Sequence, residues 1–302
     1  MSPLPTHLQV REVGPRDGLQ PEAPVPVEDR VRLIQTLVAS GVTEIEIAAF
    51  VSPRAVPSMA DAAAVVDGLG ATPGVRRWAL VPNVRGAQLA LSAGIDALTV
   101  TVSASEAYSA KNVHMSVAES IAESERISAL AAAAGRPVDV VISCAFGSPY
   151  EGDLSPDQVA RVGTAVLVGG ASRVTYADTT GMATPRRIAD LLAVTGLEMG
   201  LHLHETRGTA LVNAYAALEA GVTRFDTSIG GLGGSPFAAG AAGNLATEDL
   251  VHLCDDLGVA TGIDLDRLLE ASAVTAAIVG HPVPSRVAAA GPRSRLVAPE
   301  GS

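Results

Sequence analysis

The chain of 302 residues is poor in the features that mark secreted, membrane-spanning or nucleic-acid-binding proteins. It has two cysteines, Cys144 and Cys254, which are too few for a disulfide framework and agree with a reducing cytoplasm. Its apolar runs are too short or too interrupted to span a bilayer, and the N-terminal segment lacks the basic and apolar regions of a signal peptide. A formal net charge of −11 argues against nucleic acid or an anionic membrane as the main partner. We therefore expect a cytoplasmic protein with a small-molecule partner.

Aromatic residues and phosphate-binding loops are also scarce. Aromatic residues make up 3% of the chain and hydrophobic residues 48%, so alanine, valine, leucine and isoleucine must fill a large core. The sequence has no GxxxxGK[ST] motif, and the frame nearest to GxGxxG starts at Gly231 and fails at Pro236. These absences argue against a nucleotide-binding open sheet.

Short runs rich in β-branched residues alternate with segments of helical pattern along the whole chain. The runs predict eight strands, at 8–13, 43–50, 76–81, 97–103, 137–146, 173–178, 198–204 and 224–230. The segments between them predict helices, among them 28–40, 116–134, 155–168, 185–194 and 208–220. Ser155 and Thr184, each followed by proline, suit helix starts, and Gly41 and Gly221 suit helix ends. Eight βα units without a linker predict a closed (β/α)8 TIM barrel.

The barrel is expected to occupy about residues 8–258 of a single catalytic domain that covers 1–302. A short C-terminal extension, about 259–302, is expected to hold a helix at 264–279 and a Pro/Gly-rich tail at 281–302. A doubly wound open sheet is the alternative, but it would have fewer units and usually a phosphate loop after its first strand.

Polar residues stand at the ends of several expected strands, where the active sites of such barrels lie. Arg16 and Asp17 follow the first strand within GPRDG, and Glu46 lies between isoleucines in the second. Asp178 ends the sixth strand. The permanently charged, planar guanidinium of Arg16 suits the binding of an oxyanion, although a surface ion pair is the simpler alternative.

Two histidines two residues apart, His202 and His204, end the seventh expected strand. Residues at this spacing share one face of a strand, so both imidazoles should enter the barrel lumen. Together with Asp17 and Asn244 they form a mixed nitrogen and oxygen set, which suits octahedral Mg²⁺ or Mn²⁺ better than structural zinc. Zinc bound by fewer of these ligands is an alternative metal. Asp17 or Asn244, taken singly, would also fit a turn or helix cap.

Five segments carry a family resemblance: EVGPRDGLQ at 12–20, FVSPRAVPSMAD at 50–61, SCAFGSPYEG at 143–152, LHLHETRGTAL at 201–211 and GGLGGSPFAAGAAGNLATEDL at 230–250. From about residue 8 to 290 the chain resembles the 3-hydroxy-3-methylglutaryl-CoA (HMG-CoA) lyase family of metal-dependent TIM-barrel enzymes. The resemblance implies a lyase of leucine degradation that cleaves HMG-CoA, or a close 3-hydroxyacyl-CoA, to acetyl-CoA and a 3-oxo acid, acetoacetate. It also implies that Asp17, His202, His204 and Asn244 bind the metal.

The implied cleavage is a retro-Claisen reaction, whose needs the residues meet. It requires a base for the tertiary hydroxyl, a Lewis acid to acidify that hydroxyl, and donors for the enolate. The resemblance implies that Arg16 stabilises the enolate and that Glu46 supports Arg16 and the ligands. Asp17 and His202 are both candidates for the base.

Ser235 departs from the family pattern, which has a catalytic cysteine at this place in the glycine-rich loop. An unactivated serine hydroxyl is a much poorer acid or base than a thiol, whose pKa is near 8.5. The departure predicts a slow lyase or a lyase for a related substrate. A Claisen-type condensing enzyme and a non-catalytic CoA-thioester-binding paralogue are the alternatives. The condensing enzymes usually carry a long C-terminal region, and a non-catalytic binder has no need of the four ligand candidates.

Basic residues are the expected contacts of coenzyme A. Lys111, the single lysine, and Arg54 and Arg286 are candidates for its phosphates, although a solvated surface position is the commoner role for each. Arg207 is a second departure from the family and is expected either to contact an anionic group of the substrate or to be exposed. An acyl-CoA is the expected partner, and the protein is expected to form a homo-oligomer, a dimer.

Overall fold

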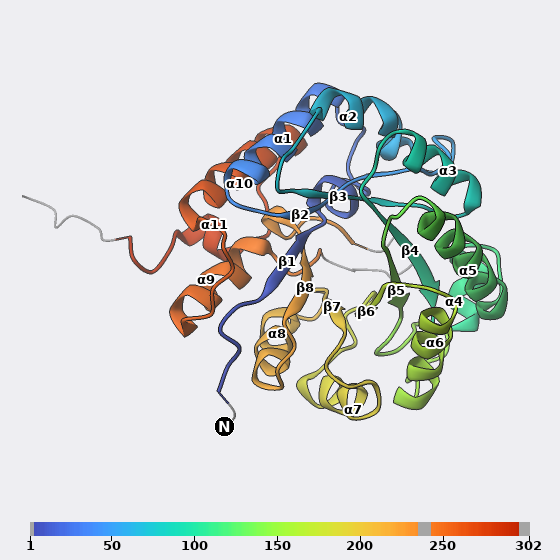
Figure 1. The fold of residues 1–302 in the computed structure, drawn as a ribbon. Coiled ribbons are helices and arrows are strands. Elements are labelled where there is room, and N and C mark those ends of the chain that lie inside the picture. Colours follow the sequence, from blue (N-terminus) through green and yellow to red (C-terminus); the bar gives the residue numbers. More distant parts are fainter. Residues whose placement is uncertain (1–2, 235–242, 296–302) are drawn as a thin grey trace, which may run out of the picture.

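Eight parallel strands, paired in chain order, close into a barrel in the computed structural model, which describes residues 3–234 and 243–295 (Figure 1). Strand β8 pairs with β1 through Gln9–Glu12, which closes the barrel. The strands are β1 Gln9–Glu12, β2 Glu44–Ala49, β3 Arg76–Leu80, β4 Ala97–Ser103, β5 Val138–Ser143, β6 Arg173–Ala177, β7 Gly200–His202 and β8 Arg224–Thr227. The predicted (β/α)8 TIM barrel is confirmed.

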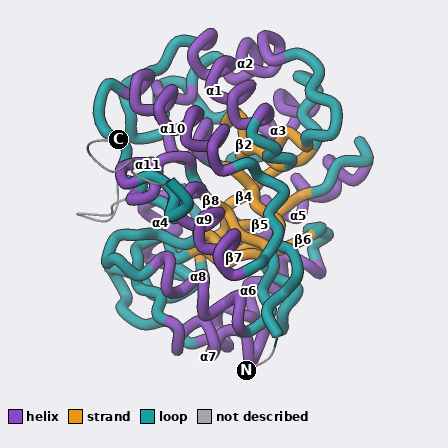
Figure 2. The backbone as a smooth tube through the Cα atoms, turned by 90° about the vertical axis from the view of Figure 1, so that its left-hand side faces the viewer, coloured by secondary structure: helices purple, strands orange, loops and turns teal. Residues whose placement is uncertain are grey.

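Helices surround the barrel on its outer side, and the view turned by 90° shows the strands enclosed by them (Figure 2). They are α1 Val27–Ala39, α2 Ala62–Leu69, α3 Val84–Ser92, α4 Glu106–Asn112, α5 Val117–Ala133, α6 Pro156–Val168, α7 Pro185–Thr195, α8 Ala210–Glu219, α9 Thr247–Leu257, α10 Leu265–Val279 and α11 Arg286–Ala290. Three single turns, η1 Gly14–Gly18, η2 Pro57–Met59 and η3 Ile229–Gly231, follow strand ends. Within the described residues, no helix is both long and apolar enough to cross a membrane.

The helix boundaries follow the capping residues found in the sequence. The side chain of Ser155 accepts a hydrogen bond from the backbone of Gln158 at the start of α6, and Thr184 does the same for Arg187 at the start of α7. At the end of α1, Gly41 has a φ of +99°, and a Cβ there would lie 2.5 Å from the carbonyl oxygen of Gly262. Only glycine fits that position without strain.

Several elements differ from the sequence-based expectation, among them β5 and β8, which end at Ser143 and Thr227 rather than at 146 and 230. Strand β7 ends at His202 rather than at 204, and His204 instead forms an isolated backbone bridge with Asn244. The expected tail contains helix α11, whose start is capped by Ser285, and the Ser285 hydroxyl also donates to Asp249 on α9. The tail therefore packs against the barrel's last helices in the part that the structure describes (Figure 1).

Candidate active site

The tight turn η1 places Arg16 and Asp17 over the lumen at the carboxyl end of β1. The backbone N–H of Asp17 donates to the carbonyl of Val13 at 2.7 Å. A Cβ on Gly14 would lie 2.6 Å from the side chain of Ile229, and a Cβ on Gly18 would lie 2.6 Å from the hydroxyl of Ser228. The turn therefore needs both glycines because it packs directly against the end of β8.

Arg16 joins two carboxylates in the lumen. Its Nε donates to Glu46 Oε2 at 2.5 Å, and its Nη1 donates to Asp17 Oδ1 at 2.5 Å. Arg16 is buried and Glu46 has no exposed surface. Burial lowers the pKa of Arg16, but attraction to Glu46 and Asp17 outweighs burial and raises that pKa above its ordinary value. The guanidinium is thus a fixed positive charge at the floor of the lumen.

His202 and His204 face each other across the same space, as the sequence predicts. Their Nε2 atoms lie 3.1 Å apart, and His202 Nε2 lies 3.8 Å from Asp17 Oδ2. One ligand atom from each of these three residues falls within 4.8 Å of the others. Asp17, His202 and His204 therefore form a group that can hold a metal ion.

The side chain of Asn244 lies beside this group, against Asp17. Its Nδ2 donates to Asp17 Oδ2 at 2.8 Å and to the carbonyl of Leu232 at 2.9 Å. Its Oδ1 is buried and has no hydrogen-bond partner among the described residues. A buried oxygen acceptor without a partner, beside a carboxylate and two imidazoles, fits the donor set of a divalent cation.

The pKa shifts of two members of the group, His204 and Asp17, suit a metal. Burial, and next the nearby His202, lower the pKa of His204 to about 3, so its imidazole is neutral at physiological pH. Burial raises the pKa of Asp17, but attraction to Arg16 and to the two histidines, with the hydrogen bond from Asn244, together outweigh burial and hold that pKa below its usual range. A neutral imidazole and an ionised carboxylate are the forms that bind metal. At His202 burial lowers the pKa, but the hydrogen bond to Asp226 and the attraction of Asp17 and Asp226 outweigh burial and raise it, so a proton competes with a metal there.

A cavity of about 710 Å³ opens above these residues. It extends from Arg16, Asp17 and the two histidines toward the carboxyl ends of β3 and β4. Its lining there is mainly apolar and includes Val81, Pro82, Val100, Tyr108 and Met115. A long substrate with an anionic reacting end and an apolar or flexible remainder fits such a space.

Asp178 has a different place from the other strand-end residues. Its Oδ1 accepts hydrogen bonds from the backbone of Met182 at 2.6 Å and of Ala183 at 2.9 Å, which holds the turn after β6. Burial raises the pKa of Asp178 to about 7. It does not belong to the metal-binding group.

The comparison with known families decides the membership of the chain. The HMGL-like family model matches residues 7–275. The chain belongs to the HMGL-like family. It is 39% identical to the cytoplasmic 3-hydroxy-3-methylglutaryl-CoA lyase of Rattus norvegicus, over 98% of this chain and 88% of the relative. It is 41% identical to the mitochondrial hydroxymethylglutaryl-CoA lyase of Bos taurus, over 95% and 90%.

Solved structures of the HMGL-like family have the same fold. The hydroxymethylglutaryl-CoA lyase of Pseudomonas aeruginosa superposes with a TM-score of 0.91 at 40% identity, over 95% of this chain and 98% of that one. An HMG-CoA lyase from Acinetobacter baumannii, in complex with coenzyme A and 3-methylmalate, gives a TM-score of 0.92 at 38% identity, over 97% and 98%.

This HMGL-like chain departs from the family pattern at two residues, Ser235 and Arg207. Ser235 lies outside the described residues. Arg207 is exposed, and its Nη1 donates to the backbone carbonyls of Thr180 at 2.7 Å and Gly181 at 2.9 Å, which ties its loop to the loop after β6.

Lys111, Arg54 and Arg286 are the predicted candidates for contact with the phosphates of coenzyme A. None of the three lines the cavity. Lys111 Nζ lies 3.9 Å from the ring centroid of Tyr150, while the side chains of Arg54 and Arg286 are exposed. The assignment of phosphate contacts to these residues stays a prediction.

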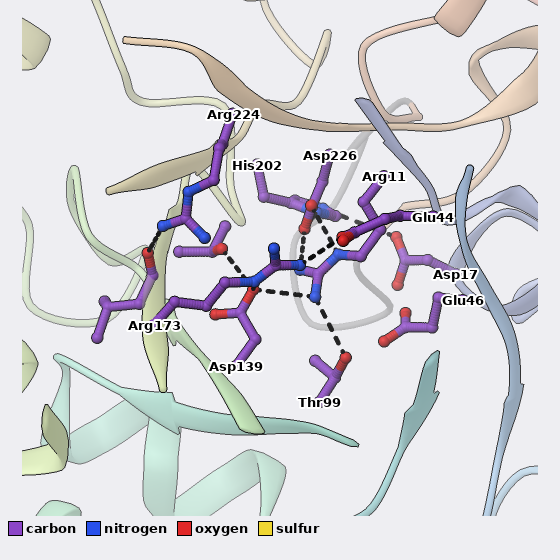
Figure 3. Close-up of polar contacts among 12 residues, drawn as sticks. Arg11, Asp17, Glu44, Glu46, Thr99, Asp139, Arg173, His202, Arg224 and Asp226 are labelled. Carbon is purple, nitrogen blue, oxygen red and sulfur yellow. Dashed lines mark hydrogen bonds and ion pairs between the residues drawn. The ribbon is translucent and has the colours of Figure 1, made fainter. Parts of the chain in front are cut away.

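Sequence reasoning missed a buried ion network directly below the candidate ligands of this HMGL-like barrel (Figure 3). Arg11 on β1 pairs with Asp226 on β8 and with Asp139 on β5, and Arg173 on β6 joins Asp139 to Glu44 on β2. A signal was present, because each of these residues is a charge within a predicted strand, as Glu46 is. The partners could not be assigned because they come from different strands.

Proposed function

We propose that the protein is a carbon–carbon lyase that cleaves HMG-CoA to acetyl-CoA and acetoacetate with the help of a divalent metal ion. The observation that carries the proposal is the group of Asp17, His202 and His204, with the unpartnered Oδ1 of Asn244, at the floor of the cavity. Membership of the HMGL-like family and the similarity of the chain to HMG-CoA lyases support the same reaction.

The four candidate ligands are Asp17, His202, His204 and Asn244, and their oxygens and imidazole nitrogens favour Mg²⁺ or Mn²⁺. When bound, the metal supplies Lewis acidity to the substrate's tertiary hydroxyl. Arg16 and Asn244 hold the carboxylate of Asp17 from two sides.

The reaction breaks one carbon–carbon bond and moves one proton. Asp17 is placed to take the proton of the tertiary hydroxyl. His202, the other candidate, can take that proton only while its Nε2 is not bound to the metal. As the carbonyl of acetoacetate forms, the electrons of the broken bond pass to the thioester carbonyl, which becomes an enolate. Arg16, fixed by Glu46, is placed to stabilise that negative charge. Protonation of the enolate carbon then gives acetyl-CoA.

Ser235 favours a second candidate, a weakened or altered lyase within the same family. We propose water or another acid as the proton donor to the enolate if the serine contributes none. The assay incubates the Mg²⁺-loaded protein with HMG-CoA and follows acetoacetate. Product from the native chain supports the lyase. Product only after Ser235→Cys supports a weakened lyase, and product from neither form overturns HMG-CoA as the substrate.

Three further expectations remain proposals that accompany this function. The protein works in the cytoplasm, which its two cysteines support. It takes part in leucine degradation, which the family resemblance supports. It forms a homodimer, which sedimentation equilibrium of the purified chain tests directly.

A further inference from the structure

Below the candidate metal ligands, the carboxylate of Asp226 connects His202 to a buried arginine (Figure 3). Asp226 Oδ1 accepts from Arg11 Nε at 2.9 Å, and Oδ2 accepts from Arg11 Nη2 at 2.6 Å. The same Oδ2 lies 3.2 Å from Nδ1 of His202. Asp226 is 6% exposed and Arg11 is 3% exposed, so water competes little for these bonds.

The bidentate pair with Arg11 determines which proton His202 carries. A carboxylate that receives both arms of a guanidinium fork is ionised, and an ionised carboxylate only accepts hydrogen bonds. Nδ1 of His202 must therefore be the protonated nitrogen. In the neutral ring, Nε2 then carries the free lone pair, and this atom lies beside Asp17 and His204.

Arg11 is itself held from two further sides. Its Nη1 lies 2.9 Å from Asp139 Oδ2, and its guanidinium carbon lies 5.1 Å from the ring centroid of Trp78. The fork therefore has little freedom to turn, and neither has the carboxylate that it binds. The orientation of the His202 ring thus follows from residues on four other strands, β1, β3, β5 and β8, rather than from its own strand alone.

His204 lacks an equivalent support. Its Nδ1 is buried and has no hydrogen-bond partner among the described residues. Its position depends instead on the backbone bridge to Asn244. The two histidines are thus held by different means, and only His202 has a carboxylate that selects its tautomer.

We propose that Asp226 is a positioning residue, held by Arg11, that fixes the Nδ1–H tautomer of His202 and so presents its Nε2 to the metal. The inference rests on the proposed function only in naming His202 as a ligand. Partners of this kind typically change metal affinity about 10–100-fold when removed.

Asp139 offers a matched control for Asp226. Both carboxylates are buried and both pair with Arg11, but only Asp226 contacts His202. If the role were merely structural, Asp226→Asn and Asp139→Asn would have the same effect. If Asp226 positions the imidazole, only Asp226→Asn changes the tautomer and weakens metal binding.

The test begins with ¹⁵N-histidine spectra of the metal-free native protein at pH 9, where a neutral ring reveals its tautomer. We expect Nδ1–H for His202, and Nε2–H would overturn the proposal. Titration with Mn²⁺, followed by electron paramagnetic resonance, should show affinity about 10–100-fold weaker for Asp226→Asn and nearly unchanged for Asp139→Asn. Equal losses in the two variants would also overturn it.

Two features of this experiment make its outcomes decisive. The native spectrum needs no variant, so it decides the tautomer even where Asp226→Asn does not fold. None of the measurements uses substrate. Failure of the native protein to cleave HMG-CoA would therefore contradict the proposed function and leave the Asp226 result intact.

Discussion

Glu12 accepts a hydrogen bond from the backbone N–H of Ile229, 217 residues later in the chain, at 2.8 Å. The same Oε1 accepts from Gly14 at 2.7 Å, and Oε2 accepts from the hydroxyl of Thr247. Glu12 has no exposed surface. It therefore ties the turn that carries Arg16 to the turn that follows β8, and both sides of the candidate site depend on it.

The buried carboxyl of Glu12 should make stability depend on pH. Burial raises the pKa of Glu12 from 4.5 to about 7. Because this acid pKa is raised in the folded state, the contribution of Glu12 to stability is greatest below pH 4.5 and falls as the pH rises toward about 7. The slope has an upper limit of about 1.4 kcal/mol per pH unit for one proton.

Glu12→Gln should remove this contribution, because the amide imitates the protonated acid and the Thr247 hydroxyl can turn to accept from it. The measurement is urea unfolding at several pH values between 5 and 8. Glu125→Gln, an exposed position on α5, is the control and should keep the native slope. A variant Glu12→Gln that retains the full native slope would contradict the prediction.

Removal of a candidate ligand should abolish or severely weaken metal binding. We expect His202→Ala and His204→Ala to lose binding of Mg²⁺ or Mn²⁺ in calorimetry, since each takes one imidazole from the group. Leu203→Ala, on the other face of the same segment, is the control for packing. An unchanged metal stoichiometry in either histidine variant would refute the assignment.

Arg16→Lys should affect the chemistry more than the metal. Lysine keeps the charge but cannot bind Glu46 and Asp17 with a planar fork, so enolate stabilisation is lost. We expect kcat to fall about 10²–10³-fold while metal affinity changes little. Arg207→Lys, at an exposed arginine outside the cavity lining, should leave kcat unchanged. A kcat within about twofold of native for Arg16→Lys would remove Arg16 from the reaction.

Gly233→Ala tests whether the glycine-rich loop must approach the ligands. A Cβ at Gly233 would lie 2.4 Å from Asn244 Nδ2, and φ there is +113°. Gly94→Ala shares a positive φ of +83° but meets nothing within 4 Å. Both should lose about 1 kcal/mol of stability from backbone strain. Only Gly233→Ala should also weaken metal binding, and equal affinities in the two variants would contradict the close approach.

The sequence by itself determined the barrel and most members of the candidate site. Strand and helix periods are local, so eight βα units could be counted without knowing which strands meet. The barrel rule then brought Arg16, Asp17 and the two histidines to one end, because the carboxyl ends of parallel strands share an edge. Asn244 was found by its place after the glycine-rich run.

The tertiary structure decided how these residues are held. The pairing of Arg11 with Asp226, and of Glu12 with Ile229, joins positions more than 200 residues apart, and no local pattern encodes it. It also decided that Asp178 holds a turn rather than joining the metal-binding group. Sequence periodicity sets which face a side chain takes on its own strand. The closure of the barrel determines which charged residue of another strand lies opposite that side chain. A buried charge is stable only when such an opposite charge pairs with it.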